Sequence, residues 1–178
     1  AFGTELEKRG IMSKMPEMLN VTAPDVIADI HKGYIDAGCD FITTNTFGAN
    51  RFKMPNENRE LVIRQAIENA KRYRTSQFVM MDIGPLGKML EPLGDLSFDD
   101  AYEAFKEMVI ISRDYVDGFI LETFSDLYEN KCALLAVKDN SAKPVITTMP
   151  FENTGHTLTG TSPRIMAELM SNMGADAI

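Results

Sequence analysis

The sequence contains 178 residues, of which 44% are hydrophobic and 25% are charged, a composition typical of a folded globular protein and not of a disordered one. Its 18 Lys and Arg residues are outnumbered by 26 Asp and Glu residues, which gives a formal net charge of -8. Because phosphate binding requires a basic surface, this charge argues against a nucleic-acid partner. The sequence shows neither a long apolar run nor a signal-peptide pattern, so we expect no membrane association and a cytoplasmic location.

The cysteines and histidines are few and isolated. Cys39 and Cys132 lie far apart among apolar neighbours, so we expect two reduced, buried thiols and not a disulfide or a zinc knuckle. His31 is expected at the surface or boundary of a helix, and His156 in a turn flanked by glycine.

Short apolar strands alternate with amphipathic helices along the chain, which is typical of parallel β/α architecture. The first half predicts a polar helix over 5–10, a helix from Thr22-Ala23-Pro24-Asp25 to Gly38, a strand over 40–44, a helix over 60–73 and a strand over 78–81. A hydroxyl cap, a first-turn proline and an acidic residue mark the start of the second helix. The helix over 60–73 is expected to bury Leu61, Ile63, Ala66, Ile67 and Ala70.

The second half continues the same alternation. It predicts a helix that opens at Ser97 with a capping box, a strand over 119–121, a helix over 126–137, a strand over 144–149, a helix from Ser162 to Gly174, and the start of a strand over 176–178. Ser125 is expected to cap the helix over 126–137, and Asp126 to favour its N-terminus through the helix dipole.

The strands recur at intervals of roughly 26 to 40 residues, as expected for one βα unit each. Since no G-x-G-x-x-G motif follows any strand, the pattern disfavours a dinucleotide-binding sheet. The sequence therefore predicts an α/β fold, a (β/α)8 TIM barrel that is incomplete, with about five to six of its eight βα units in this chain.

Polar side chains follow the apolar strands at the ends where barrel enzymes bind their substrates. Asn45, Asp82 and Glu122 are expected to lie at one mouth. Burying the Glu122 carboxylate is costly without a partner, which is either a substrate ammonium group or a backbone amide or lysine of the protein. The side chains of Asn45 and Thr46 could bind a carboxylate or an amine of a ligand, or could only stabilise the turn after the strand. Asp82 is also placed to anchor the tight turn at Gly84.

Six sequence motifs occur in an order that covers essentially the whole chain: Gly3-Thr4-Glu5-Leu6, Thr43-Thr44-Asn45-Thr46-Phe47-Gly48-Ala49-Asn50, Asp82-Ile83-Gly84-Pro85-Leu86-Gly87, Leu90-Glu91-Pro92-Leu93-Gly94, Glu122-Thr123-Phe124-Ser125-Asp126 and Thr157-Leu158-Thr159-Gly160-Thr161. Together they resemble the homocysteine S-methyltransferase family. The pair of motifs Ile83-Gly84-Pro85-Leu86-Gly87 and Leu90-Glu91-Pro92-Leu93-Gly94 looks more like the cobalamin-dependent methionine synthase branch than the betaine-dependent one.

The resemblance implies a substrate-binding role for six residues. Glu122 would receive the ammonium group of homocysteine, and Phe2 and Gly3, in the loop after the first barrel strand, would approach the substrate. The lining of the pocket would be completed by Asn45, Thr46 and Phe47.

The resemblance also implies zinc, which turns the homocysteine thiol into a thiolate, and cobalamin as the methyl carrier. The family's zinc cysteines lie beyond Ile178, so we expect no metal ligand and no catalytic residue in residues 1–178, and no activity from them alone. Cobalamin- and folate-binding modules are the partners that the resemblance implies.

Residues 1–178 are therefore expected to form one homocysteine-binding barrel domain, truncated at both ends. Two alternatives remain open from the sequence: a short non-catalytic homologue that serves as a binding or assembly module, and a sibling enzyme that takes its methyl group from betaine or S-methylmethionine.

Overall fold

The structure is a computed structural model that describes residues 2–178, and Ala1 lies outside the described residues. The strands are β1 (Phe41–Thr43), β2 (Phe78–Ile83), β3 (Gly118–Leu121) and β4 (Val145–Thr147). The helices are α1 (Phe2–Lys8), η1 (Pro16–Met18), α2 (Leu19–Thr22), α3 (Pro24–Asp36), α4 (Arg59–Lys71), α5 (Phe98–Ser112), α6 (Leu127–Asn140) and α7 (Pro163–Asn172).

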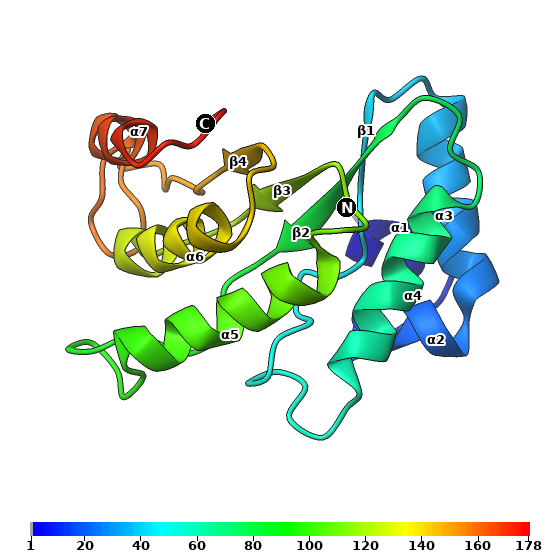
Figure 1. The fold of residues 1–178 in the computed structure, drawn as a ribbon, viewed down its shortest axis with the longest axis horizontal. Helices are drawn as coiled ribbons and strands as arrows, with labels where there is room; N and C mark the ends of the chain where they lie inside the picture. The colour runs from blue at the N-terminus through cyan, green and yellow to red at the C-terminus, as the bar shows by residue number, and fades with distance from the viewer. Residues whose placement is uncertain (1) are drawn as a thin grey trace.

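The four strands form one parallel sheet in the order β1-β2-β3-β4. A parallel bridge between Ile146 and Ala177 extends the sheet beyond β4. Figure 1 shows α3 to α7 following one another in chain order along one side of the sheet. Consecutive parallel strands joined by helices, with no reversal of strand order, are the arrangement of a barrel wall and not of a dinucleotide-binding sheet. The described residues hold four complete βα units and the start of a fifth.

Side-chain caps set two of the helix starts that the sequence predicts. Ser97 accepts a hydrogen bond from the Asp100 amide at the start of α5, and Ser162 accepts one from Ile165 at the start of α7. The predicted hydroxyl cap of α3 was wrong, because Thr22 Oγ1 donates to the Met18 carbonyl oxygen and the N-cap residue Ala23 has no side-chain cap. The predicted cap of α6 was wrong by one residue, because Asp126 and not Ser125 accepts the hydrogen bond, from the Tyr128 amide.

The core lies between the sheet and the helices that cover it, with Phe105, Phe119 and Phe124 among its largest fully buried side chains. Many methionines fill it, as expected for flexible, apolar side chains: Met54, Met80, Met81, Met108, Met149, Met166 and Met170 are buried.

Three burial predictions were wrong. Leu61 is 49% exposed, because α4 turns Val62 instead toward the core. Cys39 is only partly buried, unlike Cys132. His31 was expected at a surface or boundary and is 1% exposed, because the ring of Phe2, distant in sequence, packs edge-on against it.

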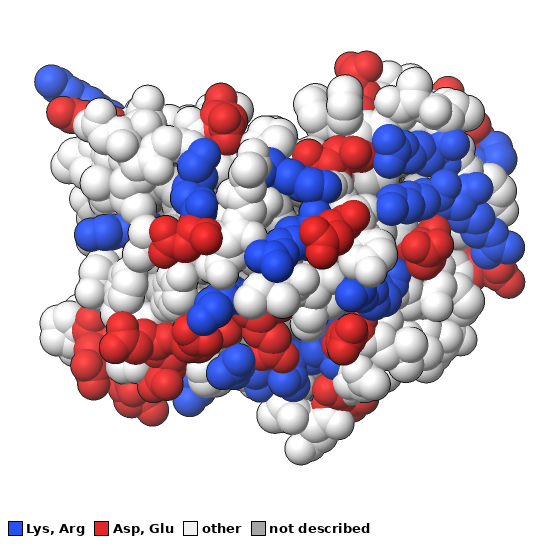
Figure 2. Space-filling view, viewed as in Figure 1, with Lys and Arg blue, Asp and Glu red and all other residues white. Residues whose placement is uncertain are grey.

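On the face drawn in Figure 2, basic and acidic side chains are interspersed, and acidic ones gather at the lower left. This is where α5 begins in Figure 1, and its first turn carries Asp99 and Asp100, which complement the positive end of the helix dipole. No helix within residues 2–178 is both long and apolar enough to cross a membrane.

Candidate functional site

A pocket of about 620 Å³ runs along the edge strand β1 and reaches the carboxyl ends of β2 and β3. Its opposite wall is built by α1, η1 and α3, which fold against this edge of the sheet. The residues that line it are Phe2, Gly3, Pro16, Glu17, His31, Tyr34, Phe41, Ile42, Thr43, Asn45, Phe47, Asp82, Glu122 and Thr123. The predicted mouth is thus part of a longer pocket that extends along β1.

Three carboxylates line this pocket, and no Lys or Arg is among its lining residues. Asp82 is 5% exposed, and its Oδ1 atom has no hydrogen-bond partner. Burial, then the neighbouring carboxylates of Glu122 and Glu17, raise the pKa of Asp82 well above its ordinary value. A site with this charge distribution attracts a cation.

The Asp82 backbone is held by two threonine hydroxyls from the loop after β1. Thr46 Oγ1 donates to the Asp82 carbonyl oxygen at 2.7 Å, and Thr44 Oγ1 accepts from the Asp82 amide at 3.1 Å. Thr46 is fully buried and does not line the pocket. It holds the end of β2 in place, and the side chain of Asp82 remains free of these bonds.

The side chain of Asn45 holds η1, which carries Glu17, against the loop after β1 through hydrogen bonds. Its Nδ2 group donates to the Pro16 carbonyl oxygen at 2.9 Å and to Asn20 Oδ1 at 3.1 Å. Asn20 returns a hydrogen bond from Nδ2 to the Asn45 carbonyl oxygen at 2.8 Å. The side-chain amide of Asn45 therefore holds the pocket wall together through residues distant in sequence. This is more than the local turn role that the sequence suggested as an alternative.

Two glycines let the pocket wall close around Phe47 and Glu17. A Cβ atom on Gly84 would lie 2.4 Å from Phe47 Cε2, and one on Gly48 would lie 2.7 Å from Glu17 Oε1. The Gly48 amide donates to this same Glu17 oxygen at 2.7 Å. Lys53, which does not line the pocket, places its Nζ atom over the Phe47 ring, 5.0 Å from the ring centroid.

Phe2 and Gly3 lie in the first turn of α1 and not in a loop, which corrects the sequence-based expectation. The Phe2 ring stands edge-on to His31, with ring centroids 5.0 Å apart. Burial lowers the pKa of His31 to about 4, so the imidazole is neutral at physiological pH. Its Nε2 atom has no hydrogen-bond partner. Gly3 is exposed at the rim.

Glu122 follows β3 directly and is half-buried, with its amide donating to the Ile83 carbonyl oxygen at 3.1 Å. The next residue, Thr123, has a φ of 65°, a left-handed conformation that is unfavourable for a β-branched residue. Such backbone strain concentrates at functional sites. Here it occurs at the turn that sets the direction of the Glu122 side chain.

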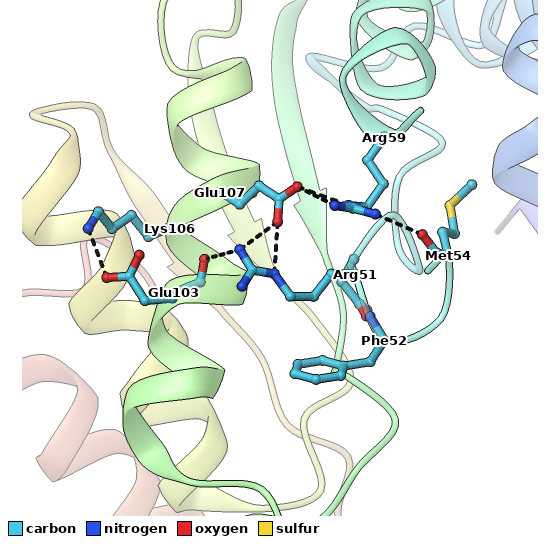
Figure 3. A network of polar contacts seen from close by, with 8 residues as sticks. Arg51, Phe52, Met54, Arg59, Glu103, Lys106 and Glu107 are labelled. Atoms are coloured by element: carbon cyan, nitrogen blue, oxygen red, sulfur yellow. Dashed lines mark hydrogen bonds and ion pairs between the residues drawn. The ribbon is translucent and has the colours of Figure 1, made fainter. Parts of the chain in front are cut away.

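The loop after β1, which carries Asn45 to Phe47, is fastened to α5 by an ion-pair network (Figure 3). Glu107 accepts from Arg51 Nε and from Arg59 Nε, each at 2.9 Å. Arg59 also donates to the Met54 carbonyl oxygen. The two guanidinium groups outweigh the effect of partial burial and lower the pKa of Glu107. The network thus fixes the part of the loop from Arg51 to Arg59, whereas the part that follows β1 directly, with Asn45 and Phe47, lines the pocket.

The described residues do not offer a zinc site. No group of three or more His, Cys, Asp or Glu side chains among residues 2–178 is placed to hold a metal ion. Cys132 is buried, and burial raises the pKa of its thiol to about 12, which disfavours the thiolate that zinc requires.

Of the sequence-predicted site residues, Phe2, Gly3, Asn45, Phe47 and Glu122 meet at one pocket, and Thr46 lies beneath it. Sequence reasoning missed Glu17, His31 and Thr123. Asp82 was expected at the mouth because it follows an apolar strand, with a turn role as the alternative, and it lines the pocket together with Glu122. Glu17 and His31 carried no such local signal, because their place depends on folding of the N-terminal helices.

The family model for homocysteine S-methyltransferase matches residues 1–178. This chain belongs to the homocysteine S-methyltransferase family. The methionine synthase of Mycobacterium tuberculosis (strain ATCC 25618 / H37Rv) is 26% identical over 202 residues, and that of Mycobacterium leprae (strain TN) is 28% identical over 202 residues. Each alignment covers 100% of this chain, which spans only 17% of the length of these relatives.

The fold is also that of a solved structure. The metallated form of the homocysteine methyltransferase MmuM from Escherichia coli matches with a TM-score of 0.84 and 18% identity, over 98% of this chain and 69% of MmuM. This likeness confirms the predicted fold class: the chain forms part of a TIM-type barrel.

Proposed function

We propose that this chain binds homocysteine by its amino-acid end, as part of a homocysteine S-methyltransferase of the methionine synthase type. The observation that carries the proposal is a pocket with three carboxylates and no basic side chain among its lining residues, at the carboxyl end of β2 and β3. Because an ammonium group relieves the repulsion between such carboxylates, an amino-acid substrate fits this charge distribution better than an anionic one.

In this proposal Glu122 receives the ammonium group, and the apolar wall of Phe2 and Phe47 contacts the carbon chain. Gly3, exposed at the rim, leaves room for the substrate to enter. Asn45 and Thr46 act as positioning residues, since their hydrogen bonds hold Glu17 and Asp82 at the pocket.

The complete enzyme would transfer a methyl group to the homocysteine sulfur. Zinc, which would favour the thiolate form of the homocysteine thiol when bound, would need ligands other than the described side chains. Methylcobalamin as the donor, with cobalamin- and folate-binding modules, is proposed from the likeness to methionine synthases. Two alternatives remain predictions: betaine or S-methylmethionine as the methyl donor, and a non-catalytic module. The cytoplasmic location and a single domain over 1–178 also remain predictions.

Isothermal titration calorimetry tests the binding role. L-homocysteine should bind at least about tenfold more tightly than 4-mercaptobutanoate, which lacks the ammonium group, because a hydrogen bond to a charged group contributes about 1.5–3 kcal/mol. Glu122→Gln should lose a similar factor for L-homocysteine and nothing for 4-mercaptobutanoate. Glu103→Gln, which removes an exposed carboxylate on α5, is the matched control and should bind like the unmodified chain. Equal affinity for the two ligands would refute the proposal.

A further inference from the structure

Asp82 is the most deeply buried of the three carboxylates in the pocket, and its role is not explained by the local fold. Its side chain makes none of the hydrogen bonds that hold the end of β2, since these involve only its backbone. Its Oδ1 atom is buried without a partner, although the residue lines the pocket. A buried, unpartnered carboxyl oxygen is costly and indicates a missing ligand.

Strand pairing places Glu122 beside Asp82. In the parallel register of β2 and β3, Asp82 is paired with Ile120 and Ile83 with Leu121. Glu122 follows at once, and its amide is bound to the Ile83 carbonyl oxygen at 3.1 Å. The two carboxyl groups therefore emerge from neighbouring strands at the same end of the sheet, into the same pocket.

We propose that Asp82 and Glu122 form a carboxyl pair that shares one proton in the ligand-free pocket and releases it when an ammonium ligand binds. The inference rests on the proposed function only in that the ligand carries an ammonium group. It makes Asp82 a second recognition group for that ammonium, beside Glu122.

The surrounding groups do not supply a positive charge to this pair. Glu17, from η1, is a further carboxylate and not a cation, and its Oε1 is already bound by the Gly48 amide. From α3, His31 is neutral because burial lowers its pKa to about 4, and Tyr34 also lines the pocket. Lys53, the cation that acts on Glu17, lies against the Phe47 ring and is not a lining residue.

The side chains of Asp82 and Glu122 are within hydrogen-bonding reach of one another, and Asp82 is 5% exposed. Two carboxyl groups this close, one of them buried, cannot both ionise without a large free-energy cost. The raised pKa of Asp82, due first to burial and then to Glu122 and Glu17, agrees with one retained proton. An entering ammonium group brings the missing positive charge. The pair then loses its shared proton to the solvent, so that both carboxyl groups are ionised, and the ammonium keeps its own protons; one proton is released per ligand bound.

The first experiment is a titration of the ligand-free protein, with its Asp and Glu side-chain carboxyl carbons labelled with 13C and followed by NMR. A resonance that titrates well above the ordinary range of an Asp carboxyl group and vanishes in Asp82→Asn supports the shared proton. Titration of Asp82 near its ordinary value, about 4, overturns it, whether or not any ligand binds. Asparagine preserves the shape of Asp82, and its backbone contacts with Thr44 and Thr46 do not need the carboxylate.

The second experiment counts protons released on binding, by calorimetry at pH 7 in buffers of different ionisation enthalpy. The probe is L-methionine, because its thioether, unlike a thiol, has no proton to lose, and Asp82→Asn then identifies the carboxyl pair as the source of a released proton. About one proton per ligand is expected for the unmodified chain and none for Asp82→Asn. Affinity should rise up to tenfold per pH unit while the pair is protonated, and stay flat in the variant.

Glu129→Gln is the matched control, since Glu129 is also a buried carboxyl group with a raised pKa but lies outside the pocket. It should release the same single proton as the unmodified chain. Binding of L-methionine without proton release, or release that persists in Asp82→Asn, overturns the inference. A failure of L-methionine and L-homocysteine to bind counts instead against the proposed function, and the NMR titration still decides whether the proton is shared.

Discussion

Glu129 on α6 offers a direct test of how burial controls the pH dependence of stability. Its Oε1 atom accepts a hydrogen bond from the Leu86 amide at 2.7 Å, which fastens the loop after β2 to α6. Burial raises the pKa of Glu129 from 4.5 to about 7, against the opposing effects of the Leu86 amide and Lys53. Glu129→Gln keeps the acceptor for Leu86 and removes the buried charge.

The sign follows from the direction of the shift. Because the pKa is higher in the folded state, the contribution of Glu129 to stability is complete below pH 4.5 and is lost as the pH rises through about 7. The shift corresponds to a loss of roughly 3 kcal/mol by pH 8. Glu129→Gln should therefore unfold with a free energy up to about 3 kcal/mol higher than the unmodified chain at pH 8, and with nearly the same value at pH 4.5.

Urea unfolding followed by circular dichroism, at several pH values from 4.5 to 8.5, measures this difference. Asp82 titrates in both proteins, so its effect cancels in the difference between their unfolding free energies. Glu103→Gln, at an exposed site on α5, should change the unfolding free energy by less than about 0.5 kcal/mol at every pH. If the difference between Glu129→Gln and the unmodified chain does not grow between pH 5 and pH 8, the burial argument is wrong.

Three further substitutions test how the pocket is built. Gly84→Ala should push the Phe47 ring out of the pocket wall, since its Cβ would lie 2.4 Å from that ring; we expect about 1–3 kcal/mol of destabilisation in urea and weaker binding of L-homocysteine in calorimetry. Glu107→Ala should cost about 1–3 kcal/mol by leaving two arginines unpaired, whereas Lys106→Ala, at an exposed ion pair, should cost less than about 0.5 kcal/mol. Thr123→Gly should raise the unfolding free energy by about 0.5–1 kcal/mol by relieving its positive φ; no gain would show that the conformation carries no strain.

The helix and strand pattern was readable from the sequence because its signals are local. Ser97 and Ser162 cap their helices through hydrogen bonds that span only three residues, so a short sequence window contains both partners. The prediction of burial failed in α4, where either of two adjacent apolar residues could face the core. Leu61 and Val62 both suit an apolar face, and a rotation of about 100° per residue separates their directions. Only the packing of α4 against its neighbours selects Val62.

The sequence by itself determined the alternation of strands and helices, the family motifs, and the place of Glu122 directly after an apolar strand. Each of these is set by residues adjacent in the chain. Only the tertiary structure decided that Glu17 and His31 share a pocket with Asp82 and Glu122, because they come from η1 and α3. Burial is a property of the whole fold, so the unpartnered oxygen of Asp82 and the neutral imidazole of His31 arise only once these separate segments are packed together.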